Sequence, residues 1–247
     1  MMLQCPAMKR FAHLSLVPAM AAMVLALASG CVPPGSGETR TAPAGAATAK
    51  APAACPAYMD LVMPAGPAPA SLSDTHFVTT WMLLGPFTFK EGDFGGDQQQ
   101  ASVNKEFMPS EGELDGTQKP PAGAAWKCMQ FTSSEGGMVD LDPVYGELDH
   151  VAAYAVAWLE CPQAAADAKL YVGSDDYMKV WVNGRLVHTY GKERRAGERD
   201  QDVVGGVELQ KGPNRIVVKC VDVVLGWNFY FRLTDAQGRP FLVKPRK

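Results

Sequence analysis

The sequence of 247 residues predicts an all-β domain, an antiparallel β-sandwich, on three observations. Short runs rich in β-forming residues recur along the chain, and turn signals such as Gly85-Pro86 and Gly136-Gly137 separate them. Asn183-Gly184 lies between two such runs and is a strong signal for a two-residue hairpin turn. No long segment has the spacing of apolar residues that is typical of a helix.

Residues 1–30 are expected to be a targeting signal and do not contribute to the fold. Lys9 and Arg10 are followed by an apolar stretch that ends in Leu27-Ala28-Ser29-Gly30-Cys31. A small residue directly before a cysteine resembles the bacterial lipobox, in which the cysteine is lipidated and becomes the mature N-terminus. The sequence therefore predicts a lipoprotein with lipidation at Cys31, and an ordinary secretory signal is the alternative. Val32 stands where an aspartate would retain the protein in the inner membrane, so we expect an outer-membrane lipoprotein, periplasmic or at the cell surface.

Residues 31–70 are dominated by Pro, Ala, Gly and Thr, and we expect them to form a flexible tether. The apolar patch from Tyr58 to Met63 leaves open a small docking segment within this tether. Residues 71–247 are then long enough for one domain with a buried core. The net charge of −3 gives no indication of nucleic-acid binding, and no apolar run after the signal is long enough to span a bilayer.

The predicted strands follow one another through the domain, and residues 91–123 between the first two are rich in loops. The strand ranges are Phe77–Leu84, Trp126–Phe131, Met138–Leu141, Val151–Leu159, Lys169–Gly173, Met178–Val182, Arg185–Tyr190, Val203–Leu209, Arg215–Val224 and Trp227–Thr234. Two of them alternate clearly, which places Tyr154, Val156 and Trp158 on one side of a strand and Trp227, Phe229, Phe231 and Leu233 on one side of another.

The hairpin at Asn183-Gly184 predicts a register and a candidate ligand-binding face. A two-residue turn pairs Trp181 with Leu186, Val180 with Val187 and Lys179 with His188. Lys179, Trp181 and His188 would then share one face, and an exposed Trp181 could stack on a sugar ring. Burial of Trp181 in the core is the alternative.

Several segments, in this order, resemble the galactose-binding-like jelly-roll modules of bacterial secreted proteins and lipoproteins. They are Trp81 to Phe87, Gly173 to Val187, Asp200-Gln201-Asp202, Lys211 to Arg215 and Trp227 to Leu233. The hairpin with its preceding Gly173-Ser174-Asp175-Asp176 is also similar to an element of protective-antigen-type carbohydrate-binding domains. Tyr177 departs from the glycine that usually follows the two aspartates, and Pro213 from a common tryptophan. The resemblance covers about residues 81–241 and implies a jelly-roll binding module.

Two further groups of residues are candidates for binding. Asp175 and Asp176 could ligate calcium, which takes several oxygen ligands, or they could cap turns by accepting backbone N–H groups. Arg194 and Arg195 lie in a charged loop and could hold an acidic glycan through bidentate contacts, or the loop is solvated with internal ion pairs.

Four cysteines remain after the lipobox: Cys55, Cys128, Cys161 and Cys220. Their spacing fits no zinc pattern. One disulfide among the last three, or buried free thiols, are both open.

No nucleophile elbow, metalloprotease motif or phosphate-binding loop is present, and nothing singles out a glycosidase pair such as Glu106 and Asp140. We therefore expect no enzyme and no cofactor other than calcium. The sequence predicts a lipid-anchored, non-catalytic envelope module that binds carbohydrate. The alternative is a structural or assembly lipoprotein that engages another envelope protein.

Overall fold

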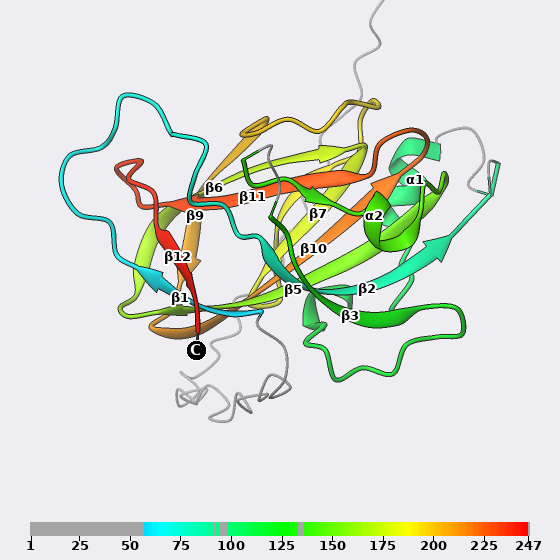
Figure 1. Ribbon diagram of the computed structural model, residues 1–247, viewed down its shortest axis with the longest axis horizontal. Helices are drawn as coiled ribbons and strands as arrows, with labels where there is room; N and C mark the ends of the chain where they lie inside the picture. The colour runs from blue at the N-terminus through cyan, green and yellow to red at the C-terminus, as the bar shows by residue number, and fades with distance from the viewer. Residues whose placement is uncertain (1–56, 91, 94–97, 133–135, 247) are drawn as a thin grey trace, which may run out of the picture. The chain divides into compact units, whose positions relative to one another are not determined.

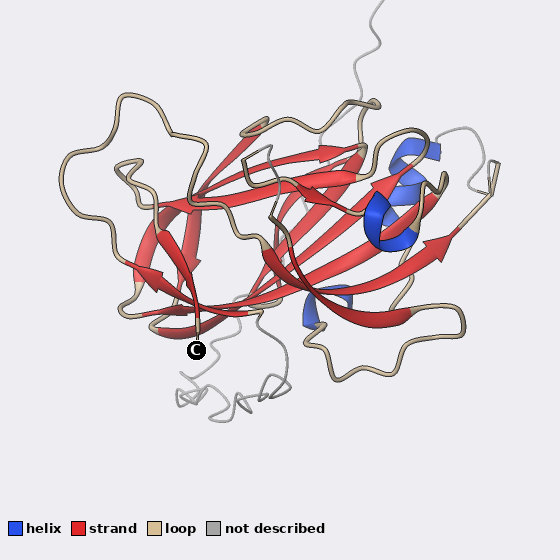
Figure 2. Ribbon diagram, in the orientation of Figure 1, coloured by secondary structure: helices blue, strands red, loops and turns tan. Residues whose placement is uncertain are grey.

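A computed structural model describes residues 57–90, 92–93, 98–132 and 136–246, and strands dominate this part of the chain (Figure 2). The strands are β1 (Tyr58–Val62), β2 (Thr80–Thr88), β3 (Ala125–Gln130), β4 (Val139–Asp140), β5 (Val151–Cys161), β6 (Ala165–Asp175), β7 (Tyr177–Val182), β8 (Arg185–Tyr190), β9 (Asp202–Leu209), β10 (Gly212–Asp222), β11 (Asn228–Thr234) and β12 (Leu242–Pro245). Two short α-helices, α1 (Gln98–Asn104) and α2 (Asp142–Tyr145), and a 3-10 turn, η1 (Glu111–Glu113), complete the described elements.

The strands form two sheets with a common core between them, so the predicted all-β sandwich is confirmed (Figure 1). The first sheet has the order β12-β1-β5-β10-β7-β8, and β2 pairs with β5 and with β3 beside this path. The second sheet has the order β4-β11-β6-β9. The strand pairs are antiparallel except for β1 with β5, which is parallel.

The strands β1 and β12, which strand propensity did not indicate, lie side by side in the first sheet (Figure 1). Met59 to Val62 pair with the C-terminal strand β12, and Tyr58 to Asp60 pair with β5. β1 lies inside the range 31–70 for which composition predicts a tether, at the apolar patch that left a docking segment open. The folded part of the chain therefore begins before Ser71.

The core between the sheets follows the predicted alternation. Trp227, which directly precedes β11, and Phe229, Phe231 and Leu233 of β11 are all at most 2% exposed and pack in this cluster. Burying a side chain of this size contributes about 1.5–3 kcal/mol relative to leaving it in water. These four residues are therefore a main source of the stability that holds the two sheets together.

A second apolar cluster lies on the outer face of the first sheet, where the segment from α1 through η1 covers it. Tyr154 of β5 and Val217 of β10 pack there against Met108 and Leu114 of the covering segment. Both faces of the first sheet are therefore buried in this region, which explains why β5 and β10 read as almost continuous apolar runs.

Lys219 fixes this covering segment to β10, and its side chain has no exposed surface. Its ammonium group donates to the carbonyl oxygens of Val103, at 3.0 Å, and of Lys105, and to the carboxylate of Glu111 at 2.7 Å. The hydroxyl of Tyr154 donates to the same carboxylate at 2.5 Å. The buried cation thus satisfies carbonyl groups at the C-terminal end of α1, where a positive charge is favourable. Burial lowers the pKa of Lys219 to about 8.

The β7–β8 hairpin turns at Asn183-Gly184 as predicted, and both residues have positive φ. Next to the turn the register also agrees, because Trp181 lies opposite Leu186. Beyond this pair the register shifts, and Val180 lies opposite His188 instead of Val187. An extra residue in one strand, a β-bulge, moves the following side chains to the other face of the ladder.

The bulge makes the predicted common face of Lys179, Trp181 and His188 wrong. His188 is cross-strand neighbour to Val180, which packs in the core between the sheets, whereas Trp181 belongs to the outer cluster. Trp181 is only 7% exposed, because η1 lies directly over it: a Cβ on Gly112 would lie 2.6 Å from its ring. The core alternative for Trp181 is therefore the observed one.

Cys161 and Cys220 are buried free thiols, and Cys128 is disulfide-bonded. No disulfide therefore joins two of these three cysteines, and Cys55 lies outside the described residues. Among those residues, no helix is long and apolar enough to cross a membrane.

Candidate functional site

Three carboxylates converge at one end of the sandwich. Asp175 ends β6, Asp176 follows it through a cis peptide bond, and Asp222 ends β10. One oxygen of each lies within 4.8 Å of the others, the single such grouping of potential metal ligands in the part of the chain that the structure describes. The sequence predicted Asp175 and Asp176 as candidates, and the fold adds Asp222 to them from a strand of the other sheet. We call these three residues the carboxylate cluster.

Asp222 is the most constrained member of the carboxylate cluster. Its side chain is completely buried, and neither of its oxygens has a hydrogen-bond partner among the described residues. Burial raises the pKa of Asp222 to about 8, and repulsion from Asp176 and Asp175 adds to this effect. An ionised carboxylate in such a place is costly unless a cation or hydrogen-bond donors compensate it.

Asp175 is the second strongly shifted member of the carboxylate cluster. Burial and the adjacent Asp176 raise the pKa of Asp175 to about 7, although the backbone of Gly197 lowers it through a hydrogen bond. With two of three carboxyl groups shifted upward, the local field is strongly negative. The cluster therefore attracts a cation, and a cation bound there would hold all three groups ionised.

Asn228 is the cross-strand neighbour of Asp175, and its side-chain oxygen faces Gly197, where a Cβ would lie 2.1 Å from it. This oxygen is buried without a hydrogen-bond partner among the described residues. Gly226 packs against these side chains, since a Cβ would lie 2.9 Å from a carboxylate oxygen of Asp175 and 3.6 Å from the Asn228 amide nitrogen, so a larger residue would displace the Asp175 carboxylate.

The loop between β10 and β11, residues 223–227, borders the cluster and is held by acidic side chains. Alternate backbone N–H groups donate to carboxylates: Val223 to Asp176 at 3.0 Å, Leu225 to Asp149 at 3.3 Å and Trp227 to Asp142 at 3.2 Å. At the tip of this loop, Leu225 has a positive φ of 81° and is 79% exposed. The loop therefore presents an apolar side chain to solvent beside the carboxylate cluster.

Arg194 is the cation that contacts the cluster. Its Nε lies 3.3 Å from Oδ2 of Asp176, and its Nη2 donates to the carbonyl oxygen of Val224 at 3.1 Å. Its side chain is 40% exposed. Arg194 thus belongs to the rim of the candidate site, as a bridge between Asp176 and the loop at 223–227.

Arg195, the other arginine predicted to bind ligand, points elsewhere. It donates to Asp202 at 2.6 Å and stacks over the ring of Tyr190 at 3.5 Å, and His188 lies 3.2 Å from the same carboxylate oxygen. Burial alone would raise the pKa of Asp202, but the hydrogen bonds from His188 and Arg195 outweigh burial and hold this pKa below its ordinary value. Arg195 and His188 therefore hold the β8–β9 loop to the sheets.

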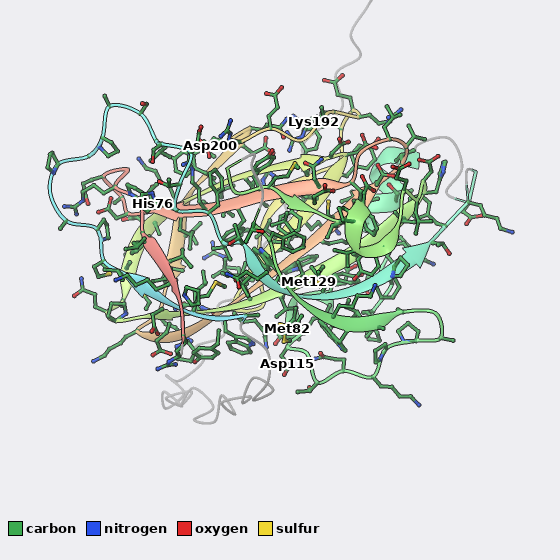
Figure 3. The ribbon with its side chains drawn as sticks, viewed as in Figure 1. His76, Met82, Asp115, Met129, Lys192 and Asp200 are labelled. Carbon is green, nitrogen blue, oxygen red and sulfur yellow. The ribbon has the colours of Figure 1, made fainter. Side chains whose placement is uncertain are left out.

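The β8–β9 loop, residues 191–201, packs closely on β6, and Lys192 and Asp200 mark its two ends in Figure 3. A Cβ on Gly173 would lie 1.8 Å from the carbonyl oxygen of Glu198, so the loop backbone rests directly on the strand. This close packing of the loop on β6 fixes the position from which Arg194 reaches the carboxylate cluster.

The donor set fits a hard cation. Carboxylate oxygens are ligands that calcium prefers, and calcium binds six to eight oxygens. The orphaned oxygens of Asp222 are the strongest indication, because a buried polar group normally has a partner. Sequence inspection missed Asp222, although a carboxylate that interrupts the apolar run from Ile216 to Val224 is a visible signal.

No family model matches the chain, and no curated protein does. Solved structures with some likeness include a PA14 sugar-binding domain from an RTX adhesin, with 15% identity, 68% of this chain and 74% of that chain covered, and a TM-score of 0.32. The PA14 domain of the MpAFP antifreeze protein is 13% identical. The match covers 68% of this chain and 70% of that domain's chain, with a TM-score of 0.31. A GH31 alpha-xylosidase from Xanthomonas citri gives 12% identity and a TM-score of 0.27 over 38% of this chain, which spans a tenth of the enzyme. Likenesses this weak say nothing about what this chain binds.

Proposed function

We propose that this protein is a carbohydrate-binding module that holds a calcium ion at Asp175, Asp176 and Asp222. The observation that carries the proposal is the fully buried Asp222 carboxylate, with both oxygens unpartnered among the described residues and two further carboxylates within 4.8 Å. Calcium bound there would offer coordination positions to sugar hydroxyl groups.

The rim of the site provides contacts for a sugar. The exposed Leu225 offers an apolar surface to the C–H groups of a ring, and the partly exposed Arg194 offers N–H donors to hydroxyl oxygens. Asp142 and Asp149 hold the loop that carries Leu225. These residues bind and orient, and none of them is assigned a part in bond breaking, so we propose a non-catalytic role.

The remaining parts of the proposal rest on the sequence. Lipidation at Cys31 would anchor the protein in the outer membrane, and the Pro/Ala-rich segment would separate the anchor from the domain. The order of the jelly-roll segments supports a galactose-binding-like version of the sandwich. The module would then present its site to glycans of the cell envelope.

The first test measures calcium binding. Calorimetric titration of the full chain with calcium is expected to show one site, and Asp222→Asn is expected to weaken it at least tenfold because a buried ligand loses its charge. Asp167→Asn is the matched control, since Asp167 is exposed and has a positive φ that asparagine tolerates. Equal affinity in the wild type and Asp222→Asn would refute the metal site.

The second test measures glycan binding. A glycan array probed with the full chain, with calcium and with a chelator, is expected to give signals in calcium only. Asp222→Asn should lose these signals and Asp167→Asn should keep them. A chain that binds calcium but no glycan would refute the carbohydrate part and leave the metal site standing.

One observation favours a second candidate, a structural or assembly lipoprotein that engages another envelope protein. β9 has one partner, β6, among the described strands, and its other edge carries Gly205 and Gly206, with open space around both, and the exposed Val203. Such an edge can accept a strand from a partner protein. Val203→Lys is then expected to abolish cross-linking to an envelope protein, whereas it should leave the glycan signals unchanged.

A further inference from the structure

A hollow of about 480 Å³ lies between the two sheets, away from the carboxylate cluster. It is bounded by the β5–β6 turn, the end of the β7–β8 hairpin and the end of β9. The residues that line it are Ala164, Ala165, Ala166, Val182, Asn183, Arg185, Val187, Glu208, Leu209 and Gln210. Cavities of this size are typical of small-molecule sites.

The hollow is distant from the proposed calcium site. Asp176 immediately precedes β7, and Val182 and Asn183 lie at the other end of that strand. At about 3.3 Å per residue, the strand separates the two places by about 20 Å. A ligand in the hollow would therefore bind independently of calcium.

The floor of the hollow is aliphatic. Val182 is 4% exposed and Leu209 is 2% exposed, and the three consecutive alanines leave the space above them free. No aromatic ring belongs to the lining, so a sugar would find no flat surface on which to stack. Methyl groups of this kind match small aliphatic side chains.

The rim carries one cation and one anion that are available to a ligand. Arg185 on β8 and Glu208 on β9 are both exposed, and neither side chain forms an ion pair with another described residue. The side chain of Asn183, by contrast, is already hydrogen-bonded: its amide nitrogen donates to Asn214, and its oxygen accepts from the backbone N–H of Arg215. A ligand in the hollow would therefore meet a positive charge on one edge and a negative charge on the other.

We infer that this hollow binds a short aliphatic peptide with free ends. Arg185 would take the terminal carboxylate in bidentate hydrogen bonds, Glu208 would take the terminal ammonium group, and the floor of Val182, Val187 and Leu209 would receive the side chains. The inference does not depend on the proposed carbohydrate function.

The test uses NMR titration of the full chain with alanyl-alanine and with forms of it that are acetylated at the amino end or amidated at the carboxyl end. Free alanyl-alanine is expected to shift the amide signals of residues 182–187 and 208–210 in a saturable way, with and without a calcium chelator. Amidation and Arg185→Gln should each weaken binding at least fivefold, and together no more than either alone, because both remove the same contact. Acetylation and Glu208→Gln should behave in the same way.

Lys192→Gln, an exposed lysine on the β8–β9 loop, is the control and should leave the titration unchanged. The blocked peptides test the same contacts in the unaltered protein, so the result does not depend on the folding of a variant. Absence of saturable shifts at millimolar peptide would overturn the inference. Equal binding of free and blocked peptides would overturn it as well.

Discussion

The ammonium group of Lys219 is a contact point at which a strand, a helix end and a 3-10 turn meet. It is fully buried, and its partners Val103, Lys105 and Glu111 all belong to the segment that covers the first sheet. A buried ion pair adds little net stability compared with an apolar pair, but removal of one partner leaves the other charge uncompensated. This side chain is therefore a central attachment of the covering segment, next to the hydrogen bonds from Arg215 to Gly112 and Glu113.

Lys219→Met is expected to lower the free energy of unfolding by about 3–5 kcal/mol, because Glu111 and the carbonyl groups at the end of α1 lose their donor. Urea unfolding measures the change. The double variant with Glu111→Gln should recover part of the loss, and Lys179→Met, which removes a half-buried lysine on the neighbouring strand, should cost much less. A loss below 1 kcal/mol in Lys219→Met would mean that the buried ammonium group is not what attaches the segment.

The same group predicts a pH dependence. Burial lowers the pKa of Lys219 from 10.5 to about 8, so between these values the unfolded state binds more protons than the folded state. The contribution of Lys219 to the free energy of unfolding is constant below pH 8 and rises with pH above it, by up to about 1.4 kcal/mol per pH unit. Urea unfolding at pH 7.5, 8.5 and 9.5, with Lys219→Met as the reference, checks this. A difference between the two proteins that stays constant from pH 7.5 to 9.5 would show that burial does not lower the lysine pKa into this range.

The backbone of the β8–β9 loop packs directly against β6 at Gly173. Gly173→Ala would place a methyl group 1.8 Å from the carbonyl oxygen of Glu198, and backbone cannot rotate away as a side chain can. We expect a loss of about 1–3 kcal/mol in unfolding free energy and faster hydrogen exchange in residues 194–201. Gly205→Ala, in a strand with open space around it, is the control and should change stability by less than about 0.5 kcal/mol. Similar stabilities in the two variants would contradict the close packing of the loop backbone on Gly173.

The β7–β8 hairpin shows which element properties follow from sequence. The turn depends on two residues that tolerate positive φ, so Asn183-Gly184 predicts it directly. The bulge between Val180 and Trp181 depends instead on how both strands pack, with His188 held by Asp202 of the second sheet. Contacts of this kind are absent from the local pattern, and the predicted face failed because of them.

In the carboxylate cluster, too, some residues could be predicted from the sequence and one could not. Asp175 and Asp176 stand next to one another and could be selected from the sequence. Asp222 comes from β10, which lies in the other sheet, and it reaches them only because both strands end at the same place. The pairing that brings such strand ends together is a property of the whole sandwich.

For the whole molecule, recurrent short strands were sufficient to predict the all-β sandwich, because alternating apolar faces can only be buried between sheets. The edges were harder to predict. β1 has five residues in a segment rich in proline and alanine, and its stability comes from its neighbours β5 and β12. Its strand conformation is a consequence of tertiary pairing, not of local preference.

A chain that begins at Ser71 is expected to be less stable than one that begins at Ala47. It would lack β1, in which Met59 and Leu61 are 1% and 2% exposed, and their loss removes about 3–6 kcal/mol of burial. The thermal unfolding midpoint should fall by about 10 °C or more. Equal midpoints for the two chains would show that β1 contributes nothing to the fold.

The position of β1 also sets at which end of the sheet the described chain enters the domain. β1 pairs with residues near the end of β5, and these lie opposite Pro213 to Arg215 near the start of β10, whereas Asp222 ends the same strand. The 11 residues of β10 span about 35 Å, so the chain joins the sheet near one pole and the carboxylate cluster occupies the other. If the end of the domain at which β1 lies faced a surface, the carboxylate cluster would point away from that surface. The hollow beside Arg185 and Glu208 would then lie at the end of the domain nearest to the surface.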